Sequence, residues 1–92
     1  MKKYIIEREL SKVGTLERKQ LRDAAARSNQ ALRLLAPEIQ WIESFVADDK
    51  TFCVYLAEDE GVIHRHAELS GFPATKITEI SKMIDPSTAR VG

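Results

Sequence analysis

The stretch "TFCVYLAEDEGVIHRHAELSGFP" (Thr51–Pro73) decides the fold, because it joins a strand pattern directly to a helix pattern. In Thr51–Glu58 both faces of the two-residue alternation carry apolar side chains, which predicts a strand in the middle of a sheet. Asp59 is placed to cap a helix that runs to Ser70, and Gly71 favours the left-handed residue that ends one. The stretch therefore predicts a central strand followed by a helix.

The segments before and after this stretch carry similar signals. Thr15 is placed to cap a first helix, whose apolar face has helical spacing and which Pro37 stops. The polar residues 48–50 predict a tight turn between two strands. The predicted strands are Lys3–Leu10, Ile39–Ala47, Thr51–Glu58 and Ile77–Ile84, and the face of the first helix consists of Leu21, Ala25, Ser28, Leu32 and Leu35.

The order of these elements is βαββαβ over a single domain, residues 1–92. This order is typical of an α+β, ferredoxin-like sandwich, in which two helices cover one face of an antiparallel four-stranded sheet. The first and third strands would form its central pair.

The other face of the sheet is left without helices in this arrangement. Apolar bulk on such a face predicts that something covers it, and a second copy of the chain is the simplest cover. We therefore expect a homodimer, as in dimeric αβ barrels. If Phe52, Val54 and Leu56 meet the helices, Cys53 and Tyr55 lie on the open face. The pocket or dimer face then includes Trp41 and Phe45 as well, if their side chains point the same way.

Composition narrows the possible partners. Fourteen basic residues balance fourteen acidic ones along the chain, so there is no basic patch for nucleic acid. No apolar run approaches the roughly 20 residues of a membrane helix, and no signal peptide is recognisable. One cysteine allows no internal disulfide and fits a reducing compartment. We expect a cytoplasmic protein with no nucleic-acid or membrane partner.

The two histidines, His64 and His66, cannot easily hold one ion together. Successive helix residues turn by about 100°, so these two side chains diverge by about 200°. His66 shares a face with Val62 and Leu69 and should point into the protein, whereas His64 should point to water. His66 is either a partly buried ring hydrogen-bonded to a backbone carbonyl or a ligand.

Cys53 and Glu7 carry the same ambiguity. A lone cysteine is typically a small buried hydrophobe, and nothing beside Cys53 activates it, so we assign no catalytic residue. Glu7 is either a metal ligand or a strand residue that meets solvent or a cation such as Arg8 or Lys82. Thiolate, imidazole and carboxylate together suit nickel, copper or zinc. Cys53 and His66 meet only if a bulge shifts the strand or a dimer completes the site; otherwise they share no ion.

The chain resembles a known family over nearly its whole length. The segments that carry the likeness are "YIIEREL" from Tyr4, "IQWIESFVADDKTFCVYLAEDE" from Ile39 and "IHRHAELSGFPATKITEISKMIDPSTA" up to Ala89. They are similar to the domain-of-unknown-function family 4242, which includes an actinomycete nickel-binding protein. The resemblance implies a dimeric ferredoxin-like fold and nickel as the ligand to test, with Cys53, His66 and Glu7 as the matching donors.

Three functions remain open at this point. The first is a small metal-binding protein that prefers nickel and serves as a buffer, sequestering agent or sensor. The second is a small-molecule-binding protein or cofactor-free enzyme of the dimeric αβ-barrel type, its pocket lined by Tyr55, Trp41, Phe45 and His66, with His66 as acid or base. The third is an interaction module in which these residues merely pack. We expect a binding protein rather than an enzyme.

Overall fold

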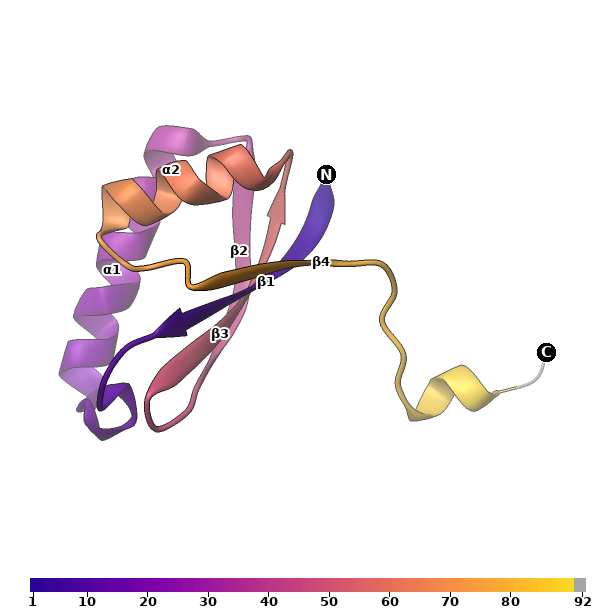
Figure 1. The fold of residues 1–92 in the computed structure, drawn as a ribbon, viewed down its shortest axis with the longest axis horizontal. Helices are drawn as coiled ribbons and strands as arrows, with labels where there is room; N and C mark the ends of the chain where they lie inside the picture. Colours follow the sequence, from indigo (N-terminus) through magenta and orange to yellow (C-terminus); the bar gives the residue numbers. More distant parts are fainter. Residues whose placement is uncertain (91–92) are drawn as a thin grey trace.

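The computed structural model describes residues 1–90 and confirms the predicted βαββαβ order (Figure 1). Two 3-10 turns add to it, one before the first helix and one near the end of the described chain. The elements are β1 (Lys2–Glu9), η1 (Val13–Thr15), α1 (Arg18–Leu35), β2 (Ile39–Val46), β3 (Lys50–Ala57), α2 (Glu60–Ser70), β4 (Lys76–Ile80) and η2 (Pro86–Ala89).

The four strands form an antiparallel sheet in the order β2-β3-β1-β4, with both helices on one face (Figure 1). The predicted fold class and the central pair are therefore confirmed. Within the described residues 1–90, no helix has the length and apolarity needed to cross a membrane.

The predicted phase of the central strand is wrong. Cys53 and Tyr55 point to the helices, where they are 5% and 2% exposed, and Tyr55 contacts the ring of His66 on α2. The pairing with β1 sets this phase, since Tyr4 lies opposite Tyr55. Phe52, Val54 and Leu56 instead occupy the open face and are half-buried. Because both faces of the strand are apolar, its alternation alone does not say which face meets the helices.

A register shift between Trp41 and Glu43 changes the face of β2. Before the shift Trp41 lies opposite Tyr55 on the helix side, and after it Phe45 lies opposite Phe52 on the open side. A bulge adds one residue to a strand and so reverses the faces that follow it. The expectation that Trp41, Phe45 and Tyr55 share the open face is therefore wrong: only Phe45 lies there.

The helix boundaries follow local hydrogen bonds. Asp59 caps α2 by accepting from the Val62 amide at 3.0 Å, as predicted. α1 begins later than predicted, because Glu17 caps it through a reciprocal pair of hydrogen bonds with Gln20, and Thr15 lies in η1 instead. The predicted helical face is confirmed, with Ser28 buried and the other four positions half-buried.

β4 is shorter than the predicted Ile77–Ile84. It pairs only with β1, and Ile80 lies opposite Lys3, one residue from the start of β1 at Lys2. Residues beyond Ile80 have no strand to pair with, and residues 81–90 run away from the sheet (Figure 1).

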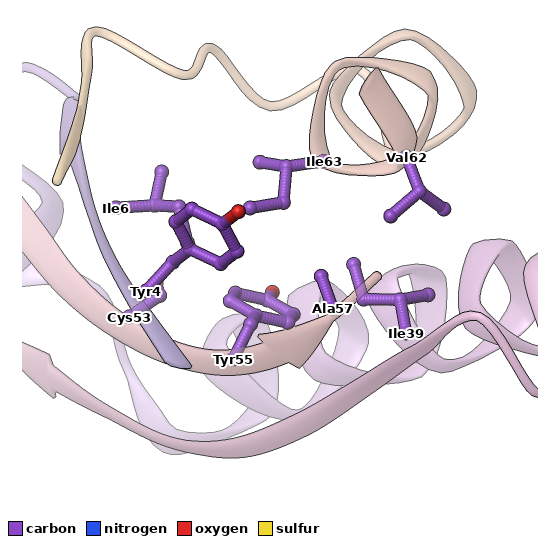
Figure 2. Close-up of a cluster of buried hydrophobic side chains, with 8 residues drawn as sticks. All are labelled: Tyr4, Ile6, Ile39, Cys53, Tyr55, Ala57, Val62 and Ile63. Carbon is purple, nitrogen blue, oxygen red and sulfur yellow. The ribbon is translucent and has the colours of Figure 1, made fainter. Parts of the chain in front are cut away.

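The densest part of the core lies between α2 and the sheet. Figure 2 shows Ile63 of α2 extending toward Tyr4 and Ile6 of β1, while Val62 lies over Ile39 and Ala57. Val62 and Ile63 are at most 1% exposed. Burial of such aliphatic side chains contributes about 1.5–3 kcal/mol each, so this contact anchors the fold.

Candidate functional site

His66 points from α2 into the protein, as predicted, and is fully buried, whereas His64 is exposed. Its Nε2 is 3.1 Å from the Ser28 hydroxyl of α1, and its ring centroid is 5.4 Å from that of Tyr55. Its Nδ1 is buried and has no hydrogen-bond partner among the described residues. Burial, reinforced by the positive charge of Arg8, lowers the pKa of His66 to about 4. The ring is therefore neutral near pH 7, as a metal ligand requires.

Cys53 lies on the same side of the sheet as His66. Its Sγ is 3.6 Å from the Thr51 hydroxyl, and the thiol is free. The structure thus brings Cys53 and His66 to one face of the sheet, which the predicted strand phase did not.

Glu7 lies on the open face of the sheet, opposite Phe52. Its carboxylate is 3.5 Å from the Lys50 ammonium, so its cation is neither Arg8 nor Lys82. Across residues 1–90 there is no group of three His, Cys, Asp or Glu side chains arranged to hold a metal ion. One chain therefore places two of the three candidate donors on one face of the sheet and the third on the opposite face.

A cavity of about 460 Å³ lies between the first half of α1 and the sheet. The helix contributes small side chains there, those of Ala24, Ala25 and Ser28, which leave space above the strands. Of the four predicted pocket residues, Trp41 and Tyr55 line it, His66 is not among its lining residues, and Phe45 is 56% exposed on the other face. Mostly apolar lining with a few polar groups is typical of small-molecule sites.

Arg8 also lines this cavity and is 3% exposed. Its Nη1 donates to the Pro73 carbonyl at 2.9 Å and to the Phe72 carbonyl at 3.3 Å, while Nη2 is buried without a partner. Its Cζ is 5.9 Å from the centroid of the Tyr55 ring. Burial raises the pKa of Tyr55 although the Arg8 charge opposes that shift, so the phenol keeps its proton.

The sequence interpretation passed over Arg8 as a site residue. The signal was present, since the two-residue period that places Tyr4 and Ile6 on the core face also places position 8 there. A charged residue at a core position of a central strand is a functional candidate, because such residues are rarely buried without a partner.

Comparison with known proteins agrees with this architecture. The structure of SCO4226 from Streptomyces coelicolor A3(2) is similar, with a TM-score of 0.73 and 14% sequence identity over 89% of this chain and 99% of that one. At this identity the likeness concerns the fold alone. Comparison with curated proteins gives no significant match. Residues 4–80 match the family described as nickel responsive protein SCO4226-like. On that match, which spans most of its length, the chain belongs to the SCO4226-like family of nickel-responsive proteins.

Proposed function

We propose that this protein binds nickel or another divalent ion in the cytoplasm, as a buffer, a sequestering agent or a sensor. Family membership is the observation that carries the proposal, since the matched residues 4–80 contain Cys53, His66 and Glu7. The family is described as nickel responsive, and these residues carry donor atoms that suit nickel.

Cys53 and His66 are the proposed donors on the helix side of the sheet. A cysteine thiolate and a neutral imidazole are both good ligands for nickel, and burial of His66 keeps its ring neutral. The unpartnered Nδ1 of His66 supports a ligand role, because a buried ring nitrogen without a hydrogen bond is otherwise costly. Glu7 enters the proposal as a separate oxygen donor on the open face.

A second copy is the proposed cover of the open face. Ile5, Phe52, Val54 and Leu56 are half-buried there, and Phe45 is 56% exposed beside them. Two such faces can pack against each other as sheets do in sandwiches. A Phe45→Glu variant should then reduce the molar mass measured by light scattering to that of one chain. A native protein that is already monomeric at high concentration would contradict this part of the proposal.

Calorimetric titration of nickel, zinc and copper into metal-free protein tests the metal proposal. We expect nickel to bind and to produce a thiolate-to-metal charge-transfer band in the absorption spectrum. Cys53→Ala should abolish the band, and His66→Gln should weaken binding about tenfold or more, as loss of a metal ligand does.

His64→Gln is the matched control, because His64 lies on the exposed side of the same helix. It should bind nickel as the native protein does, and Glu7→Gln reports separately on the open face. Circular dichroism shows whether each variant is folded. Native protein that takes up no nickel at micromolar concentrations would refute the proposal.

A further inference from the structure

The cavity beside α1 contains a positive charge with no counter-ion. Arg8 is the one charged side chain among the described residues that line it, and no Asp or Glu is among them. Ion pairs between residues 1–90 involve Lys2, Lys50 and Arg65, and none involves Arg8. Burial of an ion costs free energy that its surroundings must offset, and an unpaired guanidinium is an expensive case.

Hydrogen bonds within the chain satisfy only some of the N–H donors of this guanidinium. Two backbone carbonyls accept from Nη1, and both are neutral groups. Nη2 keeps two N–H donors free in a region shielded from solvent. A guanidinium fits a carboxylate particularly well, because its donors form short, charge-assisted bonds to the two oxygens.

The groups around Arg8 fit the same kind of ligand. The Tyr55 phenol, which burial keeps protonated, and the hydroxyls of Ser28 and Thr51 line the cavity and are able to donate to an oxygen. Outside the cavity, Arg27 of α1 holds its guanidinium 5.5 Å from the centroid of Phe72, which also lines it. A second positive charge near the cavity favours the approach of an anion.

From the buried, partly satisfied Arg8 and the apolar cavity it lines, we propose that this cavity binds a small organic carboxylate whose apolar body lies beneath α1. The carboxylate pairs with the guanidinium of Arg8, and the body contacts Leu21, Ala25 and Trp41. The largely apolar walls match an aliphatic or aromatic body better than a bare inorganic anion. This inference does not depend on metal binding.

Three probes test the proposal in metal-free buffer, and two of them differ from the first in a single feature. They are octanoate, octanamide, which has the same body without the charge, and acetate, which has the charge without the body. Trp41 is the single tryptophan of the chain and lines the cavity, so its fluorescence reports binding alongside calorimetry. We expect octanoate to bind about tenfold or more tightly than octanamide and about a hundredfold more tightly than acetate.

Arg8→Met tests the anchor, because it removes the charge and keeps an unbranched apolar side chain. It should remove the preference for octanoate over octanamide, a loss of about tenfold or more. Arg65→Met is its control, since Arg65 is exposed and paired with Glu38 at 3.0 Å, away from the cavity. It should leave both affinities unchanged.

Ala25→Phe tests the cavity without changing any charge, and keeps the proposal testable if Arg8→Met does not fold. The added ring should fill the space and abolish binding of both eight-carbon probes, whereas Ala26→Phe, on the exposed side of the same helix, should not. Octanoate that binds no better than octanamide, or that binds Ala25→Phe as it binds the native protein, would overturn the proposal. Cys53 also lines the cavity, so the two proposals are separated by the metal-free buffer: octanoate that binds there reports on this cavity and not on metal uptake.

Discussion

The two helices cover the same face of the sheet but pack on it in different ways. α2 has 11 residues and buries four of them, including Val62, Ile63 and His66. α1 has 18 residues and buries two, both small, Ser28 and Ala31. The shorter helix therefore contributes more buried side chains than the longer one, which stands over a cavity. One half of the covered face serves stability, and the other half has room for a ligand.

The difference follows from the side chains that each helix presents. Branched aliphatic residues of α2, Val62 and Ile63, extend toward the strands and pack in the core cluster (Figure 2). Over the cavity α1 presents Leu21 and three small side chains, Ala24, Ala25 and Ser28, which are too short to fill the gap. Leu32 and Leu35, nearer its end, pack against the core cluster. The turn just before α1 is held in place, because the Gly14 amide of η1 donates to the Asp48 carbonyl at 2.9 Å.

The largest expected effect is on the α2 side. Ile63→Ala leaves a void in a tightly packed region, so we expect the free energy of unfolding to fall by about 2–5 kcal/mol. Leu21→Ala, on α1, only enlarges an existing cavity and should cost about 1 kcal/mol, the transfer free energy of the atoms lost. Urea unfolding measures both. Equal losses would show that the two halves are packed alike.

The second effect concerns the pH dependence of stability and arises at His66, where α2 meets Ser28 of α1. The pKa of His66 is about 4 in the folded protein and about 6.5 in the unfolded chain, so the unfolded chain binds the proton first as pH falls. The contribution of the neutral His66 ring to the free energy of unfolding is therefore complete above pH 6.5 and is lost as the pH falls from 6.5 to 4. The loss is about 3 kcal/mol, at about 1.4 kcal/mol per pKa unit.

Urea unfolding of native protein and His66→Gln at several pH values isolates this contribution from that of the carboxylates. The variant should lose the extra pH dependence, and His64→Gln should keep it, since His64 is exposed. A native protein that loses no more stability than His66→Gln over this range would show that the folded ring titrates normally.

The third effect concerns Gly14, in the turn just before α1. A Cβ on Gly14 would lie 2.7 Å from the Ala47 carbonyl oxygen and 2.8 Å from the Asp48 Cα, both backbone atoms that cannot move aside alone. Gly14→Ala should therefore cost about 1–3 kcal/mol in thermal or urea unfolding. Gly61→Ala is the control: its Cβ would meet only the Asp59 side chain at 3.1 Å, and a helix favours alanine. A larger loss at Gly61 would contradict this account.

The sequence predicts the fold better than the site, for physical reasons. Strand alternation, the Asp59 cap and Gly71 are local signals, and they are sufficient for the βαββαβ order. The phase of β3 is not local, because Phe52 and Cys53 are both apolar and only the pairing with β1 chooses between their faces. The bulge after Trp41 likewise follows from pairing and has no signal in the residue types.

The cavity depends on a distance between elements that are remote in sequence. Ala24 and Ala25 are good helix formers, so their presence in a helix indicates nothing about a space beneath it. Arg8 differs, because alternation with Tyr4 and Ile6 already places it on the core face. A buried charge was therefore predictable from the sequence, whereas the cavity it lines was not.

The smallest expected effect has the opposite sign and tests the cavity directly. Ala25→Leu adds three carbons where the protein has free space, so it should leave stability unchanged or raise it by about 0.5–1 kcal/mol. The same added volume in a filled core typically costs about 1–3 kcal/mol. Ala26→Leu, exposed on the same helix, gives the background change from helix propensity. A loss at Ala25 of the size expected for a filled core would mean that α1 lies against the sheet as closely as α2 does, and no space would remain for a ligand of Arg8.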